Sequence, residues 1–195
     1  MPHYQKLSGE KCYLSPPASE DAELWAAWFN DLEVTLPLGD EAYMPFGLEK
    51  AREEVADTIR WQGHIFSIVD LESDRLIGRC LLFSVDPVNR SAKLGIFIGE
   101  KSLWGRGYGQ EAIRLLLDYA FNLLNLHSVM LGAFAFNERA LAAYRKAGFR
   151  EIGRRREARL VGGRAHDVVL MDILEDEFRA RHGSTIAVEG AHAAR

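Results

Sequence analysis

The chain has 195 residues, of which 48% are hydrophobic and 27% charged, and its formal net charge is −4. This length and balance are those of a soluble globular protein with one full hydrophobic core, and the acidic charge argues against nucleic acid as the main partner, because a phosphate backbone requires a basic face. No N-terminal apolar segment and no run of about 18 apolar residues appears, so we expect no secretion, no membrane partner and a cytoplasmic location.

Hydrophobic periodicity and turn residues predict a strand, a helix, an irregular segment, a second helix and three antiparallel strands in the first half of the chain. We expect Ser19 to be the N-cap of the first helix. Cys12 and Cys80 are too far apart for a metal or redox motif, and no metal site is expected. Cys80 lies in an apolar strand and is expected to be a core residue. In chain order these elements cover residues 11–14, 22–30, 31–46, 48–63, 65–70, 76–85 and 92–99.

The second half predicts a helix, a strand, a further helix and a terminal hairpin. Asn137 is the expected N-cap of the second of these helices and Gly148 its C-cap. The hairpin turns around Gly162-Gly163. We expect a single domain over residues 1–180 and a disordered tail over 181–195, which has no periodicity. The elements cover residues 113–124, 129–136, 140–147, 150–160 and 165–174.

A glycine-rich loop connects the strand over 92–99 to the helix that follows it. Gly105, Gly107 and Gly109 stand at alternate positions, where the absence of a Cβ lets an anion approach the backbone. The helix N-terminus adds unpaired N–H groups and a positive dipole end, and Arg106 adds a fixed charge. The loop therefore predicts a pyrophosphate-bearing cofactor. Its spacing fits neither a P-loop nor a dinucleotide-binding loop.

Two motifs together indicate which cofactor it is. The first is the loop Leu103-Trp104-Gly105-Arg106-Gly107-Tyr108-Gly109, and the second is the later string Asn137…Ala140…Tyr144…Gly148-Phe149. Together they resemble the GCN5-related N-acetyltransferase (GNAT) superfamily, in particular its RimJ/RimL-like, spermidine-acetyltransferase-like branch. Trp104 replaces the Gln or Arg that opens the acyl-CoA loop in most of the family, as is usual in this branch. The resemblance covers roughly residues 10 to 178.

The resemblance implies an α/β (α+β) fold: a central, mostly antiparallel mixed sheet with helices on both faces, splayed at the acyl-CoA site. It also implies acetyl-CoA as cosubstrate and direct transfer of its acetyl group to a primary amine in a ternary complex. In the family the pantetheine arm pairs with the strand before the loop, so a backbone amide there, that of Ile98, is expected to stabilise the carbonyl oxygen. The implied cofactor-binding residues are Phe97, Ile98, Gly99, Trp104, Gly105, Arg106, Gly107, Tyr108, Gly109, Gln110, Asn137, Ala140, Tyr144 and Lys146.

The resemblance implies that Tyr144 is the general acid, since a phenol stays protonated at neutral pH and can protonate a thiolate. The alternative is an aromatic core residue on an amphipathic helix. The general base is less well defined. Many relatives carry a Glu at the position of Lys93, which as a lysine cannot serve unless its pKa is strongly lowered. Glu100 is the candidate base, and the alternative is a solvated carboxylate at a strand end.

The acidic, aromatic segment over 31–46 is where relatives shape the acceptor site. Glu33, Glu41 and Tyr43 are the candidate acceptor-binding residues, with ordinary surface as the alternative. The acceptor class is left open between a protein N-terminus, a polyamine and another small amine. A non-catalytic acyl-CoA-binding or sensing module and an unrelated nucleotide-binding protein are the alternative functions.

The predicted terminal hairpin has two further features. Its second strand is apolar on both faces, which predicts a homodimer or larger homo-oligomer that covers the outer face. Arg154, Arg155 and Arg156, with Arg150 and Arg159, form a basic cluster, which we interpret as solvent-facing strand positions rather than a binding patch.

Overall fold

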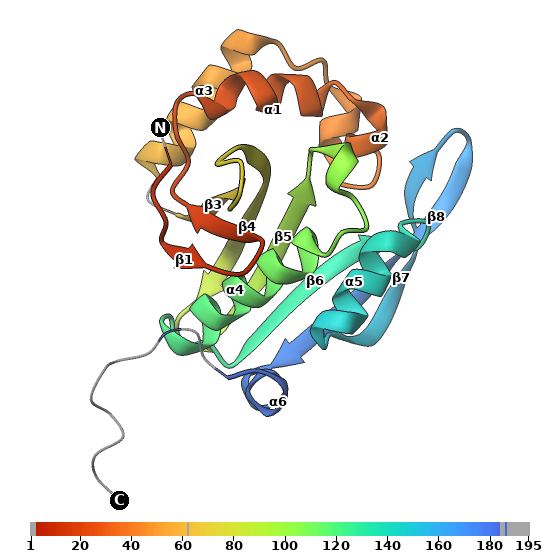
Figure 1. Ribbon diagram of the computed structural model, residues 1–195. Coiled ribbons are helices and arrows are strands. Elements are labelled where there is room, and N and C mark those ends of the chain that lie inside the picture. Colours follow the sequence, from red (N-terminus) through yellow and green to blue (C-terminus); the bar gives the residue numbers. More distant parts are fainter. Residues whose placement is uncertain (1–2, 62, 184–185, 187–195) are drawn as a thin grey trace, which may run out of the picture.

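The computed structural model describes residues 3–61, 63–183 and 186, and it contains one eight-stranded sheet in the order β1-β2-β3-β4-β5-β6-β8-β7 (Figure 1). The strands are β1 Leu7–Ser8, β2 Cys12–Ser15, β3 His64–Asp70, β4 Leu76–Asp86, β5 Ser91–Ile98, β6 Ser128–Phe134, β7 Arg150–Val161 and β8 Arg164–Leu174. The helices are α1 Asp21–Phe29, α2 Leu32–Thr35, α3 Leu48–Arg60, α4 Tyr108–Asn122, α5 Glu138–Ala147 and α6 Glu175–Arg181, with short 3₁₀ turns η1 Asp40–Tyr43 and η2 Lys101–Leu103.

The predicted mixed sheet is confirmed. All neighbouring strands pair antiparallel except β5 and β6, which are parallel. Three predictions need correction at the element ends: β1 and α6 were not expected, and α4 begins at Tyr108 instead of residue 113. The segment over 31–46, expected to be irregular, contains α2 and η1.

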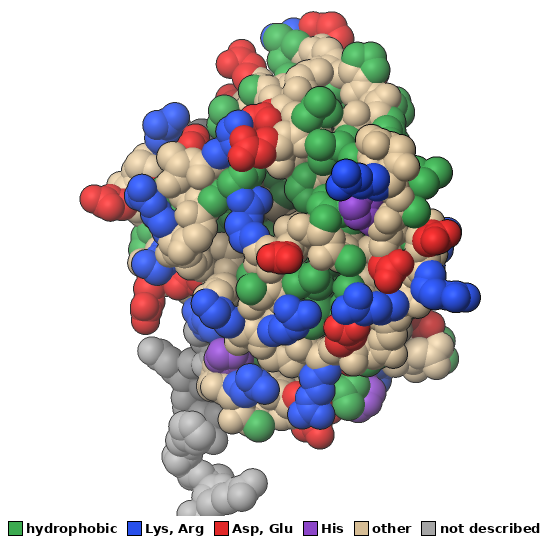
Figure 2. All heavy atoms as spheres, turned by 90° about the vertical axis from the view of Figure 1, so that its right-hand side faces the viewer, with side chains coloured by type: hydrophobic (Ala, Val, Ile, Leu, Met, Phe, Trp, Pro, Cys, Tyr) green, Lys and Arg blue, Asp and Glu red, His purple; other side chains and the backbone are tan. Residues whose placement is uncertain are grey.

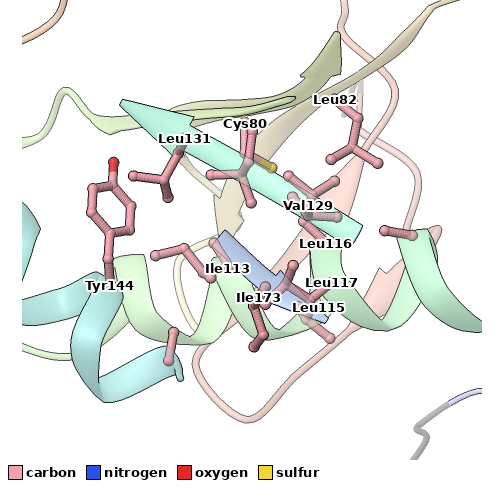
Figure 3. Close-up of a cluster of buried hydrophobic side chains, with 14 of the residues drawn as sticks. Cys80, Leu82, Ile113, Leu115, Leu116, Leu117, Val129, Leu131, Tyr144 and Ile173 are labelled. Atoms are coloured by element: carbon pink, nitrogen blue, oxygen red, sulfur yellow. The ribbon is translucent and has the colours of Figure 1, made fainter. Parts of the chain in front are cut away.

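Helices cover both faces of the sheet, as predicted. On one face α4, α5 and α6 pack against the sheet (Figure 1), with Phe121 and Phe178 among the buried side chains. Leu116 of α4 belongs to the same core (Figure 3). On the other face α1 and α3 form a smaller aromatic cluster around Trp25 and Phe29. Strand residues alternate between these two cores because successive side chains point to opposite faces.

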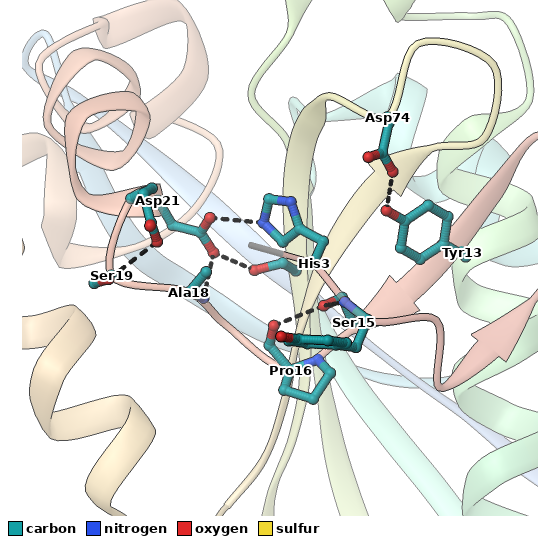
Figure 4. Close-up of polar contacts among 11 residues, drawn as sticks. His3, Tyr13, Ser15, Pro16, Ala18, Ser19, Asp21 and Asp74 are labelled. Carbon is teal, nitrogen blue, oxygen red and sulfur yellow. Dashed lines mark hydrogen bonds and ion pairs between the residues drawn. The ribbon is translucent and has the colours of Figure 1, made fainter. Parts of the chain in front are cut away.

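The N-terminal segment and α1 are joined by a buried carboxylate that the sequence analysis missed. Ser19 does not cap α1, since the N-cap is Glu20 and makes no side-chain capping bond. Instead the Asp21 carboxylate accepts hydrogen bonds from the Ala18 amide at 3.1 Å and from the Ser67 hydroxyl, and it lies 2.8 Å from His3 Nε2 (Figure 4). One residue thus holds the chain start, α1 and β3 together.

The hairpin turn is built as predicted. Gly162 and Gly163 have φ of 57° and 76°, the left-handed region that a tight hairpin favours and that glycine adopts without strain. The interpretation of Arg159 as solvent-facing is wrong, because its side chain is only 5% exposed. It donates to the Gly39 carbonyl and stacks over the rings of Tyr43 and Phe134. Arg159 therefore ties the hairpin to the segment that carries η1.

The last helix of the described residues is α6, whose final residue, Arg181, lies just past the predicted domain limit at residue 180. Ile186 packs against the main core. Most of the tail predicted to be disordered, residues 184–185 and 187–195, lies outside the described residues. No helix in the described part of the chain combines the length and apolarity that a bilayer span requires.

Candidate active site

A cavity of about 950 Å³ opens where β5 and β6 separate. Their parallel pairing covers only three residue pairs and ends at Lys93 and Met130. Beyond this point no strand of the described residues pairs with the inner edge of β5, which is the splay that the sequence analysis predicted. On the face of the molecule seen in Figure 2, hydrophobic side chains gather in a hollow bordered by Lys and Arg side chains.

Most of the predicted site residues line this cavity. They are Glu41, Phe97, Ile98, Trp104, Gly105, Arg106, Gly107, Tyr108, Gly109, Gln110, Asn137, Ala140, Tyr144 and Lys146. Four predicted residues do not line it: Gly99, Glu100, Glu33 and Tyr43. A Cβ on Gly99 would lie 2.1 Å from the indole of Trp28, so this glycine permits close packing of α1.

The glycine loop presents free backbone donors at the start of α4. Gly107 is the N-cap, and the first amide that bonds back to it is that of Glu111, at 3.0 Å. In the described part of the chain the amides at positions 108–110 have no acceptor. Gly105 and Gly107 have φ of 74° and 91°, so both need glycine, whereas Gly109 does not have a positive φ. The loop thus has the open backbone and unpaired N–H groups of an anion site.

The inner edge of β5 was expected to present the backbone of Phe97, Ile98 and Gly99 to the cofactor, but the backbone groups of Phe97 and Gly99 face the other way. The Gly99 amide donates to Ile77 of β4 at 2.9 Å, and the Phe97 carbonyl also faces β4, next to Gly78. Backbone groups alternate along a strand, so those of Ile96 and Ile98 face the cleft. Phe97 reaches the cavity through its ring. The Ile98 carbonyl accepts the Trp104 indole N–H at 2.7 Å, which leaves the Ile98 amide directed into the cleft.

Trp104 is fixed from both sides. Besides its hydrogen bond to β5, its ring lies 3.4 Å from the guanidinium carbon of Arg139 on α5. Burial lowers the pKa of Arg139, and the negative charge of Glu33 opposes this effect. The stacked pair therefore links the glycine loop to α5 across the mouth of the cavity.

Tyr144 lies between the core and the cavity. Its ring stands off α5 beside Leu131 of β6 and packs edge-on against Phe149 at 5.9 Å (Figure 3). Within the described residues its hydroxyl has no hydrogen-bond partner. Burial raises the pKa of Tyr144 to about 12, so the phenol is protonated at neutral pH. The ring therefore belongs to the core, and the residue also lines the cavity, a position that the predicted role of general acid requires.

Helix α5 is capped as predicted. The Asn137 side chain accepts from the Ala140 amide at 3.2 Å, and Gly148 ends the helix with φ of 106°. The cap holds Asn137 at the cavity wall, two turns from Tyr144. Ala140 and Lys146 lie on the same helix, so a ligand along α5 can contact all of them.

The geometry argues against Glu100 as the base. Its carboxylate caps η2, accepting from the Ser102 hydroxyl at 2.6 Å and from the Ser102 amide at 3.2 Å. These hydrogen bonds lower its pKa, with a smaller contribution from the positive charge of Arg75. A carboxylate that is already satisfied, and that lies outside the cavity, is a poor proton acceptor.

The acidic segment contributes one carboxylate to the cavity, that of Glu41. Glu33 is instead paired with Lys101 at 2.9 Å and its side chain is 65% exposed. The Tyr43 hydroxyl donates to the Leu160 carbonyl at 3.3 Å and its ring packs on Arg159. Of the described acidic residues, only Glu41 is therefore placed to meet an acceptor in the cavity.

Three residues near the site were missed from the sequence. Lys11 lies beside the glycine loop, with its Cε 3.6 Å from the position of a Cβ on Gly107. Glu111 of α4 accepts the amides of Glu10, Lys11 and Cys12 at 2.7–2.8 Å and so fixes the β1–β2 turn next to that loop. Arg79 of β4 lines the cavity from its other side. The contact of Lys11 with Gly107 and the bonds of Glu111 to the β1–β2 turn each join residues about 100 positions apart, so no local sequence pattern could indicate them.

Comparison with known proteins identifies the family. A family model for the acetyltransferase (GNAT) domain matches residues 11–150. The uncharacterized N-acetyltransferase p20 of Bacillus licheniformis is 26% identical over 176 residues, covering 89% of this chain and 98% of that protein. Spermidine N(1)-acetyltransferase of Vibrio cholerae is 33% identical over 114 residues, covering 58% of this chain and 65% of the enzyme.

Solved structures agree with this assignment. The crystal structure of spermidine N-acetyltransferase from Vibrio cholerae in complex with CoA and spermine has a TM-score of 0.76 and 26% identity, covering 86% of this chain and 98% of that one. The same family fold and the cavity at its splayed strands exclude the unrelated nucleotide-binding protein considered above. The chain therefore belongs to the GNAT acetyltransferase family and is an N-acetyltransferase that uses acetyl-CoA.

Proposed function

We propose that this protein transfers an acetyl group from acetyl-CoA directly to a primary amine, on a small molecule or at a protein N-terminus. One observation carries the proposal: a single cavity joins the free donors of the glycine loop, the inner edge of β5 and Tyr144. These are the parts needed to hold an acyl donor, stabilise its carbonyl oxygen and protonate its leaving group.

The proposed cofactor contacts follow from the position of each group. The amides at 108–110, with Arg106 and Lys11, suit the phosphates of the CoA moiety. The cleft-facing backbone of Ile96 and Ile98 suits the amides of the pantetheine arm, as an added strand. Asn137, Ala140 and Lys146 lie opposite, along α5. Acetyl-CoA itself supplies the acetyl thioester and the thiolate leaving group.

The chemistry that these residues can perform is acyl transfer through attack of a neutral amine. The C–N bond forms as the C–S bond breaks. The Ile98 amide would stabilise the charge on the carbonyl oxygen, and the Tyr144 hydroxyl would give its proton to the leaving sulfur. We assign to Glu41 the binding of the ammonium group and, through water, the acceptance of its proton.

Direct transfer is favoured because the described residues that line the cavity offer no thiol, imidazole or aliphatic hydroxyl that could form an acetyl-enzyme. In the described part of the chain no Ser, Thr, Cys or His lines the cavity. Cys12 and Cys80 are buried in the core, where desolvation raises the pKa of both thiols and keeps them protonated. A ping-pong enzyme would need an activated side chain in this position.

The test is release of free CoA thiol from acetyl-CoA across an amine panel of polyamines, aminoglycosides, amino sugars, amino acids and short peptides. We expect at least one amine to give thiol and N-acetylated product in equal amounts. Binding of acetyl-CoA without turnover on any amine would contradict the proposal and support the non-catalytic binding module instead.

A further inference from the structure

Arg79 places a guanidinium in the cavity wall on the sheet face opposite α4. Its β4 position pairs with Phe97 of β5, and directly opposed residues share a face. The neighbouring Cys80 points the other way, into the core beneath α4. The β4 residues on the face of Arg79, which are Leu81 and Phe83, also line the cavity.

Among the residues that the structure describes, none forms an ion pair with Arg79. Its guanidinium carbon lies 4.5, 5.5 and 5.6 Å from the ring centroids of Trp25, Phe29 and Phe97. Its buried Nε makes no hydrogen bond, and within the described residues no carboxylate lies within 4.0 Å of the group. Glu41 and Glu54 act on the charge only from a distance. The terminal nitrogens are not fully buried, so they can reach a ligand.

The cations on the other side of the cavity are better placed for CoA. Arg106 belongs to the glycine loop and Lys146 to α5, while Arg139 is stacked on Trp104. Arg79 instead belongs to β4, and its guanidinium stacks on the aromatic cluster that includes Trp25 and Phe29. A phosphate on the glycine loop therefore leaves the charge of Arg79 uncompensated, which is costly for a largely desolvated guanidinium.

We propose that Arg79 binds an oxyanion of the acceptor, so that the acceptor is a primary amine that also carries a carboxylate or phosphonate on an apolar body. This inference rests on the proposed function and specifies its substrate class. The guanidinium fork matches the two oxygens of such a group, and the aromatic rings hold the fork in one orientation.

The rest of this wall agrees with such an acceptor. Val34, Pro37 and Leu38 line the cavity together with Leu81 and Phe83, and they suit an apolar body. Glu41 is the single carboxylate that the described residues contribute to the cavity. A polycationic amine would find one carboxylate there and would lie beside an unpaired arginine, so we expect polyamines to be poor acceptors.

The test compares amines that differ only in the anion. Thiol release would be measured with phenylalanine, phenylalaninamide and phenethylamine, and with leucine and leucinamide. Aminoethylphosphonate and spermidine complete the panel, the former separating phosphonate from carboxylate recognition. We expect kcat/KM to be at least about tenfold higher for an anionic acceptor than for its neutral partner. Equal or better use of the neutral amines or spermidine would overturn the inference, whereas no turnover with any amine would contradict the proposed function itself.

Variants at Arg79 assign the preference to this residue. Arg79→Gln should raise KM for the anionic acceptor by at least about tenfold more than it raises KM for the neutral amine, while Arg79→Lys should restore part of the preference. Arg52→Gln, which removes an exposed α3 arginine paired with Glu49, is the matched charge control. If Arg79→Gln does not fold, Arg79→Lys still tests the idea. A preference unchanged in a folded Arg79 variant would refute it.

Discussion

At the residue scale, three backbone positions in the glycine loop differ in what a side chain would do there. Gly105 and Gly107 have positive φ, so any substitution strains the backbone before it touches a ligand. A Cβ on Gly109 meets only Ile98 Cγ1, at an ordinary 3.8 Å. Gly109 is therefore the position at which ligand approach can be blocked without refolding the loop.

Replacing Gly109 with Val should weaken acetyl-CoA binding by more than tenfold, or about 1.4 kcal/mol, because a branched side chain would stand where the phosphates approach free amides. Gly109→Ala, whose smaller side chain fits the protein, should lose less affinity for acetyl-CoA. Isothermal titration calorimetry measures the acetyl-CoA affinity of both variants, and an unchanged melting curve shows that each variant is folded. Unchanged affinity in a folded Gly109→Val protein would move the phosphate site elsewhere.

Tyr144→Phe keeps the ring against Phe149 and Leu131 and removes only the hydroxyl. Folding and acetyl-CoA binding should survive, while kcat falls by about 10²–10⁴, as expected for loss of a general acid. Single-turnover thiol release should be used, so that slow product release cannot mask the chemical step. A loss of less than threefold would reduce Tyr144 to a packing residue.

The pH dependence follows from the raised pKa of Tyr144. A general acid works while protonated, so its contribution is present below its pKa of about 12 and is lost only above it. The amine must be neutral to attack. We therefore expect kcat/KM to rise with pH and reach a plateau, with no descending limb below about pH 10. A descending limb near neutral pH that disappears in Tyr144→Phe would show that the phenol ionises far below this value.

At the element scale, Glu111 couples α4 to the β1–β2 turn. Burial opposes ionisation of Glu111, but three backbone N–H donors outweigh it and lower its pKa. Because the pKa of Glu111 is lower in the folded state, its ionised carboxylate stabilises the fold at pH values above the unfolded pKa of about 4.3. This stabilisation is lost as the pH falls through the folded-state pKa. Glu111→Gln should therefore cost about 1–2 kcal/mol of unfolding free energy at pH 7 and clearly less near pH 3. Urea denaturation at the two pH values measures this; an equal cost at both would remove the charge from the explanation.

Elements whose ends are set by local chemistry were predictable from the sequence. Asn137 and Gly148 delimit α5, and Gly162-Gly163 turns the hairpin, because each acts within a few residues of itself. Most of the predicted residues that line the cavity were also indicated this way, since the glycine loop and α5 each carry a local motif.

Features that depend on distant contacts were not predictable. Asp21 replaces Ser19 at the start of α1 because its partners come from the N-terminus and from β3. The sequence pattern gave no sign that Arg159 is buried, because its partner, the Gly39 carbonyl, is distant in the sequence. For the same reason, the sequence offered Glu33 and Glu41 as equals, and only the fold pairs Glu33 with Lys101 and leaves Glu41 in the cavity.

At the scale of the whole molecule, we propose a homodimer or larger homo-oligomer that covers the outer face of the terminal hairpin, where the half-buried Val168 and Leu170 lie. Val169, Met171 and Ile173 of β8 point into the core, whereas Val168 and Leu170 lie on the other face and belong to neither buried cluster. Light scattering at micromolar concentration should give twice the chain mass of 22.0 kDa or a larger multiple. A mass near 22.0 kDa would rule this assembly out.

The central claim is direct acetyl transfer to an amine in a cavity whose described lining contains no Ser, Thr, Cys or His side chain. Incubation with acetyl-CoA, with and without an active amine, followed by thiol titration and intact-mass analysis of the protein, tests it most directly. The account predicts thiol release only when the amine is present, with N-acetylated amine formed in equal amount and the protein mass unchanged. An acetylated protein that forms without amine and then passes its acetyl group on would contradict it.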